Sequence, residues 1–212
     1  MQIRASNSFC IQMKGNTNSS DPLKNFRNFL TFVAPGPEEE TETFLKLLKP
    51  VRIYKGEYFI SEGQIPRKFA FINKGLFRYL YIDKTGKEFT KNFLTEGKFI
   101  VSYSAMIAQK TSLLYIEALE DSDILEIDYN QWLEVKKRHE CWSVLLIAML
   151  EHAFSVKEKR ERDLLLLDAR ERYIDFLNEF PTLESRVKQH MIASYLGISP
   201  ISLSRIRKNE NH

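Results

Sequence analysis

Serine, arginine and lysine recur in one short segment near the end of the chain, residues 189–208, with the sequence QHMIASYLGISPISLSRIRK. Arginine, lysine and serine side chains donate hydrogen bonds to phosphate oxygens, and arginine can also bond to two acceptor atoms of guanine. Ser202 and Arg205 are three residues apart, so a helix would place them on one face. We expect Arg205 to contact a base edge and its polar neighbours to contact phosphates. The candidate DNA-binding residues are Ser199, Ile201, Ser202, Arg205, Arg207 and Lys208.

The elements that would position these side chains are two helices joined by a tight turn. Ala193 is small where two helices must approach closely, and Gly197 occupies the turn. Ser199 and Pro200 favour the start of the second helix, because serine caps a helix N-terminus and proline is tolerated at the first helical position. Apolar contacts between the helices would come from Ile192, Leu196, Ile198, Leu203 and Ile206. The segment therefore predicts a helix–turn–helix.

The charge distribution favours DNA as the partner of this segment. The chain from Arg186 onward has a net charge of +4, whereas the preceding 185 residues sum to −1. A local positive end on a nearly neutral chain is the electrostatic pattern expected for phosphate contact. The competing interpretation is a helix–turn–helix with a structural role only.

Residues 51–128 are typical of an all-β domain. Short runs rich in aromatic and aliphatic residues are separated by glycines at intervals of about ten residues. Apolar residues recur with period two at Phe69 and Phe71, which would place this pair on one face of a strand. Gly86 is expected to take a positive φ in a hairpin turn. So many short strands predict a double-sheet β-roll, or jelly roll.

A long helix is predicted after the β-roll, because the stretch from Gln131 to about Leu166 contains no Gly or Pro. Along this stretch, seam residues recur at steps of three and four residues. This is the pattern of a helix that packs along a second helix. We therefore expect a homodimer held by this seam. The alternating charges of residues 157–163 are interpreted as a solvent-exposed surface of the same helix. The seam consists of Trp142, Leu145, Met149, His152 and Val156.

The predicted fold class is α+β, with four parts. Two short helices, at 23–30 and 38–48, precede the strands, and another helix at 169–179 follows Asp168, a typical N-cap residue. The parts are a flexible leader at 1–21, the β-roll at 22–130, the dimerisation helix at 131–167 and a small helix–turn–helix domain at 168–212.

The composition, 43% hydrophobic and 28% charged, is that of a soluble globular chain. The longest apolar runs are far shorter than the ~20 residues needed to cross a bilayer. The first residues lack the continuous apolar segment of a secretion signal. Two cysteines, Cys10 and Cys141, are too few for a disulfide framework. We therefore expect a cytoplasmic protein that does not bind a membrane.

The order of these parts resembles the Crp/Fnr family of bacterial transcription regulators over about residues 23–208. The resemblance rests on the helix–turn–helix and on four motifs: YKGEYFISEG at 54–63, FINKG at 71–75, DKTGKE at 83–88 and LTEGKF at 94–99. It implies a regulator that binds DNA sequence-specifically, with RNA polymerase as a further candidate partner. A homodimer would hold two recognition helices about one DNA turn, ~34 Å, apart, and this implies a palindromic operator. We expect no full β-hairpin wing, because the sequence stops at His212.

The cyclic-nucleotide site of that family is degenerate in this sequence. In cAMP-binding members, a Gly-Glu pair begins a short helix and holds the ribose, and an arginine followed by Ser or Thr neutralises the cyclic phosphate. Here Gly97 is followed by Lys98, and Ser112, with Thr111 beside it, stands at the arginine position. A buried phosphate without a cation is electrostatically costly, so we do not expect tight cAMP binding.

No cofactor is expected, and the sequence does not identify an effector. Two cysteines cannot supply the four ligands of the iron–sulfur cluster found in the oxygen-sensing branch of the family. All four histidines lie outside the β-roll, so haem ligation is not expected either.

An enzyme is the main competing class of function, because metal-dependent cupins share the β-roll. Residues 51–128 contain no His and no Cys, whereas a cupin normally needs several His ligands. We therefore expect no enzymatic activity. The alternative that stays open is a ligand-binding or protein-interaction scaffold with this fold but without sequence-specific DNA binding.

Overall fold

The computed structural model describes residues 21–210, which form two compact units. The first contains residues 21–78 and Phe93–His152, and the second contains Tyr79–Asn92 and residues 153–210. The boundary falls inside a β-hairpin and inside the long helix, so each unit holds part of both. The predicted leader at 1–21 lies outside the described residues except for Asp21, and Cys10 lies outside them too.

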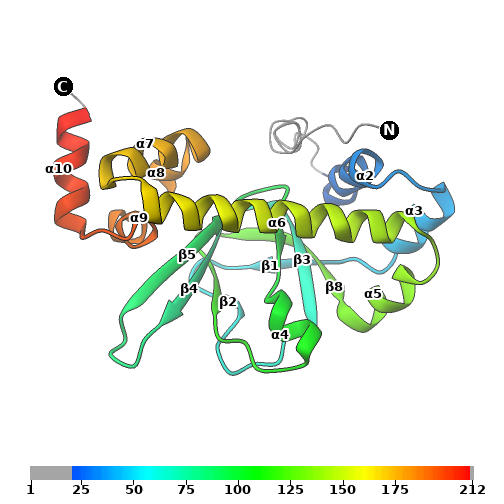
Figure 1. The fold of residues 1–212 in the computed structure, drawn as a ribbon. Helices are drawn as coiled ribbons and strands as arrows, with labels where there is room; N and C mark the ends of the chain where they lie inside the picture. The colour runs from blue at the N-terminus through cyan, green and yellow to red at the C-terminus, as the bar shows by residue number, and fades with distance from the viewer. Residues whose placement is uncertain (1–20, 211–212) are drawn as a thin grey trace. The chain divides into compact units, whose positions relative to one another are not determined.

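The β-roll consists of short antiparallel strands in two sheets (Figure 1). In chain order the strands are β1 (Lys49–Ile53), β2 (Tyr58–Ile60), β3 (Lys68–Lys74), β4 (Phe77–Ile82), β5 (Glu88–Leu94), β6 (Phe99–Ile100), β7 (Tyr115–Ala118) and β8 (Ser122–Asp128). One four-stranded sheet has the order β1-β8-β3-β6 and the other has the order β2-β7-β4-β5. Gly86 has a φ of 83° in the turn between β4 and β5, as predicted. The predicted jelly-roll fold is confirmed.

Helices precede and follow the roll and interrupt it once. They are α2 (Pro22–Val33), α3 (Glu38–Leu45), α4 (Tyr103–Ala108), α5 (Tyr129–Lys136), α6 (Cys141–Leu166), α7 (Ala169–Glu179), α8 (Leu183–Arg186), α9 (Gln189–Leu196) and α10 (Pro200–Glu210). The helix predicted at 38–48 ends early, at Leu45, because the chain enters β1 only four residues later. The helix predicted at 169–179 is confirmed, and Asp168 caps it through a capping box with Glu171.

The prediction of one unbroken helix over 131–167 is wrong in its first part, because the chain breaks between α5 and α6. Trp132 and Trp142 lie in the same aromatic cluster, with ring centroids 6.2 Å apart. Ten residues of one straight helix would separate them by about 15 Å. Both rings pack on Phe44, so burial of the two tryptophans favours the break. From Cys141 to Leu166, α6 is continuous (Figure 1).

Polar contacts anchor the start of α6 to the N-terminal helices of the first unit. The indole N–H of Trp142 donates to Glu40 at 3.0 Å, and Arg138 forms an ion pair with the same carboxylate at 3.1 Å. These two donors lower the pKa of Glu40, Arg138 more than Trp142. The start of α6 is therefore held against α3 by both apolar and charged contacts.

Candidate nucleic-acid interface

The predicted helix–turn–helix is present as α9 and α10. Gly197 ends α9 with a φ of 70°, in the left-handed region that favours glycine. The hydroxyl of Ser199 accepts a hydrogen bond from the backbone N–H of Ser202 at 3.1 Å, which is the expected cap of α10. Ala193 and Leu203 are completely buried where the two helices meet. The local sequence thus fixes the geometry of the turn.

One face of α10 points into solvent. Helical periodicity places Ile201, Arg205 and Lys208 along this face, and all three are exposed. Ile201 is 67% exposed, a high value for a large apolar side chain. The described residues provide no ion-pair partner for Arg205 or Lys208. Ser204, which was not among the predicted DNA-binding residues, is also exposed on this face.

Arg207 lies elsewhere, contrary to the expectation that it contacts phosphate. It is separated from Arg205 by about 160° around the helix axis. Its guanidinium is 2.9 Å from the carboxylate of Glu184 on α8, which also accepts a hydrogen bond from Tyr173 at 2.7 Å. Arg207 therefore connects α10 to α7 and α8 within the domain. Helical spacing in the sequence could have shown that Arg205 and Arg207 point to different sides of α10.

Ser199 and Ser202 occupy the first turn of α10. Their hydroxyls are 2.9 Å apart and bond to each other as well as forming the cap. Both residues are at the surface, Ser199 exposed and Ser202 half-buried. The N-terminal N–H groups of a helix attract anions, so this end of α10 suits contact with a phosphate.

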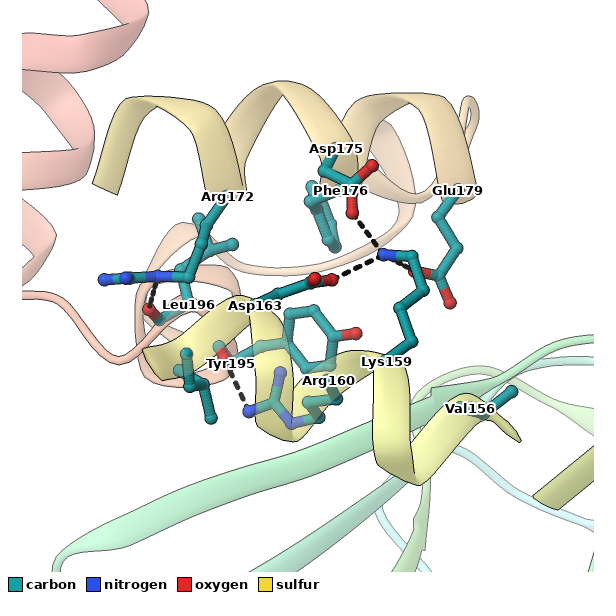
Figure 2. Close-up of a pocket in the computed structure, with 11 residues that line it drawn as sticks. Val156, Lys159, Arg160, Asp163, Arg172, Asp175, Phe176, Glu179, Tyr195 and Leu196 are labelled. Atoms are coloured by element: carbon teal, nitrogen blue, oxygen red, sulfur yellow. Dashed lines mark hydrogen bonds and ion pairs between the residues drawn. The ribbon is translucent and has the colours of Figure 1, made fainter. Parts of the chain in front are cut away.

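A charged network holds the helix pair against the C-terminal half of α6 (Figure 2). Lys159 forms ion pairs with Asp163 on its own helix and with Asp175 and Glu179 on α7. Burial opposes the charge of Lys159, but hydrogen bonds to Asp163 and Asp175 outweigh it and raise its pKa. The interpretation of residues 157–163 as a solvent-exposed surface is thus wrong for Lys159 and for Asp163, which is buried.

Two arginines complete the network in Figure 2 by binding backbone carbonyls of α9. Arg160 donates to the carbonyl oxygen of Tyr195 at 2.6 Å, and its guanidinium lies 3.9 Å from the centre of the tyrosine ring. Arg172 donates to the carbonyl oxygen of Leu196 at 3.0 Å. These carbonyls belong to the last turn of α9, where a helix leaves acceptors without an internal partner. Cations at this end are also favoured by the helix dipole.

The residues proposed for the degenerate ligand pocket are not all brought together. Ser112 is 0% exposed, and its hydroxyl is 2.9 Å from that of Ser102 and donates to the carbonyl oxygen of Leu114 at 2.9 Å. Thr111 is exposed at the surface beside it. Ser112 therefore belongs to a buried hydroxyl pair that the sequence analysis did not find.

Lys98 does not stand at the start of a helix, unlike the Gly-Glu pair of the cAMP-binding relatives. Gly97 and Lys98 lie in the loop before β6, where their backbone groups bond to Ile72. The short helix α4 begins only after Ser102, at Tyr103.

The seam predicted for dimerisation packs on the chain's own β-roll instead. Trp142 and Leu145 are each 1% exposed and belong to the aromatic core of the first unit, which Met149 also contacts. Burial and the charge of Lys98 lower the pKa of His152. Val156 is half-buried beside the charged network of Figure 2. Trp142 and Leu145 are therefore not available to a second protomer, whereas Met149, His152 and Val156 are only half-buried.

The opposite face of α6 carries exposed apolar side chains, from here on called the α6 stripe. The stripe consists of Val144, Ile147, Leu150 and Phe154, spaced by three and four residues. Phe154 is 66% exposed. Helical geometry separates the stripe from the predicted seam by about half a turn. Contiguous exposed apolar surface of this kind marks an interaction site.

Neither a metal site nor a membrane span is found in the part of the chain that the structure describes. No group of three or more His, Cys, Asp or Glu side chains in residues 21–210 could hold a metal ion. No helix in the same range is long and apolar enough to cross a membrane.

Residues 50–139 match the family model of the cyclic nucleotide-binding domain. No curated protein sequence matches the chain. The fold is also similar to that of solved bacterial regulators. The c-di-GMP-responsive global regulator CLP of Xanthomonas campestris is 14% identical with a TM-score of 0.66, over 82% of this chain and 92% of that chain.

Two further structures have a similar fold. A Eubacterium rectale protein described as a transcriptional regulator of the Crp/Fnr family is 16% identical with a TM-score of 0.67, over 86% of this chain and 87% of that chain. FixK2 of Bradyrhizobium japonicum is 17% identical with a TM-score of 0.68, over 76% of this chain and 83% of that chain. The resemblance to Crp/Fnr regulators is thus confirmed at the level of the fold.

Proposed function

We propose that this chain is a dimeric, sequence-specific DNA-binding transcription regulator of Crp/Fnr type. The observation that carries the proposal is the solvent-facing side of α10, where Arg205 and Lys208 are exposed. This side of a second helix in a helix–turn–helix enters the major groove in known DNA complexes. Arg205 would contact a guanine edge, whereas Ser199, Ser202 and Lys208 would contact phosphates.

The α6 stripe is the proposed dimer contact. Apolar residues at three- and four-residue steps on a long helix match the seam of a two-stranded coiled coil. A symmetric pair of α6 helices would bury Ile147 and Phe154 of both protomers. It would also present two copies of α10 to DNA, so the operator would be a palindrome.

The β-roll is proposed to bind no cyclic nucleotide tightly. The buried hydroxyls of Ser102 and Ser112 satisfy each other where the resemblance implies a phosphate-neutralising arginine. Two hydroxyls provide no positive charge, so a buried cyclic phosphate there would be electrostatically costly. The effector would then be an uncharged compound or a ligand at another position, or the regulator would act without one.

A DNA-binding titration at moderate salt tests the proposal. Fluorescence anisotropy of a labelled duplex should increase with wild-type protein, and Arg205→Ala should reduce the affinity. Arg207→Lys is the matched control, because it keeps the charge and leaves the solvent-facing side of α10 unchanged. Absence of any DNA binding by the wild type would favour the alternative, a scaffold that uses the same fold to bind a protein or a small ligand.

A further inference from the structure

The β4–β5 hairpin and the helix–turn–helix belong to the same compact unit, although about 100 residues separate them in the sequence. The side chain of Ser194 connects them. The backbone N–H of Thr90 on β5 donates to the hydroxyl of Ser194 on α9 at 2.8 Å, and this hydroxyl donates to the carbonyl oxygen of Glu88 at 3.2 Å. Ser194 therefore bridges two backbone groups that lie two residues apart on one strand.

This bridge occupies the open edge of a sheet. In the order β2-β7-β4-β5, the strand β5 is terminal and has a neighbour on one side only. An edge strand presents unpaired N–H and C=O groups that need another partner. A serine hydroxyl both accepts and donates a hydrogen bond, so Ser194 replaces the backbone of a missing strand.

Burial makes the bridge important for the packing of the hairpin. Thr90 is 3% exposed, so water does not reach its backbone N–H in the folded chain. Water could replace Ser194 as the acceptor only if the hairpin separated from α9. The side-chain hydroxyl of Thr90 is buried too, and it has no hydrogen-bond partner in residues 21–210. Burial of this unpaired hydroxyl opposes the packing of the hairpin on α9. The contacts between the hairpin and α9, which include the Ser194 bridge, must offset this free-energy cost.

We infer that Ser194 is a positioning residue that clamps the β4–β5 hairpin to α9 and so holds α10 in its orientation for DNA. The clamp leaves the solvent-facing side of α10 uncovered, so the clamped state is compatible with DNA binding. A displacement of β5 by the sensor roll would reach α10 through α9, because these two helices share the buried contact of Leu203. The hairpin clamp itself rests only on the structure, whereas its effect on affinity rests on the proposed function.

Hydrogen exchange of the Thr90 amide, measured by NMR or mass spectrometry on the full chain, tests the clamp. Ser194→Ala should make this amide exchange about 2- to 10-fold faster, which is the range expected for loss of one net hydrogen bond. Ser194→Thr keeps a hydroxyl and should restore most of the protection. Ser185→Ala is the matched control, because the Ser185 hydroxyl bonds only within its own turn, to Thr182. Unchanged exchange in Ser194→Ala would overturn the inference.

DNA affinity tests the positioning role separately. A loosened helix pair must be ordered on binding, so Ser194→Ala should bind DNA about 2- to 10-fold more weakly than Ser185→Ala. Faster Thr90 exchange combined with unchanged or tighter DNA binding would overturn the positioning role. Failure of the wild type to bind DNA would contradict the proposed function, and Thr90 exchange alone would then decide whether the clamp exists.

Discussion

Arg205 and Arg207 lie on opposite sides of α10, although one residue separates them in the sequence. Arg205 is exposed, whereas the guanidinium of Arg207 is 2.9 Å from the carboxylate of Glu184. The two arginines therefore have different expected roles, and matched substitutions can separate DNA recognition from the stability of the domain.

Arg205→Ala should weaken binding to the preferred DNA site about 5- to 150-fold, since a bidentate arginine–guanine pair contributes about 1–3 kcal/mol of discrimination. The thermal midpoint of unfolding should stay the same because Arg205 is exposed and has no ion-pair partner among the described residues. Arg207→Ala should instead lower the free energy of unfolding by about 1 kcal/mol, because it breaks a partly buried ion pair with Glu184. Anisotropy titrations and thermal melts of both variants check this pair of expectations. Equal DNA affinities for the two variants would contradict it.

Lys208→Ala should weaken binding to all DNA sequences by a similar factor. Each phosphate contact releases condensed counterions, so the slope of log K against log salt should fall by about one unit. Titrations of a specific and a random duplex at several salt concentrations give both quantities. A change of base preference without a change of slope would assign Lys208 to a base instead of a phosphate.

Phe154→Glu should dissociate the dimer, because it places a charge in the proposed apolar contact along the α6 stripe. Ala153→Glu is the matched control: Ala153 is exposed on the adjacent position, and helical geometry turns it about 100° away from Phe154. Light scattering at micromolar concentration measures the mass. The proposal requires a dimer for the wild type and for Ala153→Glu, and a monomer for Phe154→Glu. A monomeric wild type would contradict it.

Ser112→Ala should destabilise the β-roll by about 1–3 kcal/mol, since the buried hydroxyl of Ser102 would lose its partner. Thr111→Ala removes a hydroxyl from the neighbouring exposed residue and should change the free energy of unfolding by less than about 0.5 kcal/mol. Denaturant titrations compare the two variants. In calorimetry, the wild type should show no micromolar binding of cAMP or cGMP. Such binding would mean that the Ser102–Ser112 pair opens and that another group holds the phosphate.

The free energy of unfolding should decrease below about pH 6.5, and part of this decrease should depend on His152. Burial, and then the charge of Lys98, lower the pKa of His152 in the folded chain. Below the pKa of His152 in the unfolded state, the unfolded chain binds a proton on His152 more readily than the folded chain does. The contribution of neutral His152 to the free energy of unfolding is therefore present above that pKa and is lost as the pH falls. Denaturant titrations from pH 7.5 to 5.5 should show a smaller loss for His152→Gln than for the wild type. The exposed His190→Gln should behave like the wild type.

The helix–turn–helix could be predicted from the sequence because its determinants are local. Gly197 and Ser199 fix the turn and the cap within three residues of each other. The contact of Arg207 within the domain could not be predicted, because residue type alone does not show which side of α10 meets the domain. Its partner Glu184 belongs to a separate short helix, α8, whose position depends on tertiary packing.

The burial of Trp142 and Leu145, two residues of the predicted dimer seam, could not be predicted for a related reason. The first half of α6 is apolar on more than one side, so both Leu145 and Ile147 belong to patterns with three- and four-residue spacing. Only tertiary packing, such as that of Trp142 on Phe44 of α3, shows which face of α6 belongs to the core of the first unit. Contacts between distant segments, such as Ser194 with the hairpin and Trp132 with Trp142, were likewise invisible to a local pattern.

Selection of binding sites from a random duplex library tests the central claim most directly, that this chain reads a specific DNA sequence as a dimer. The wild type should enrich a palindrome whose half-sites are centred about one DNA turn apart, 10–10.5 base pairs. Arg205→Ala should enrich the same spacing with relaxed preference at one base pair in each half-site. Enrichment of no sequence by the wild type, or identical enriched sequences for the wild type and Arg205→Ala, would contradict the account.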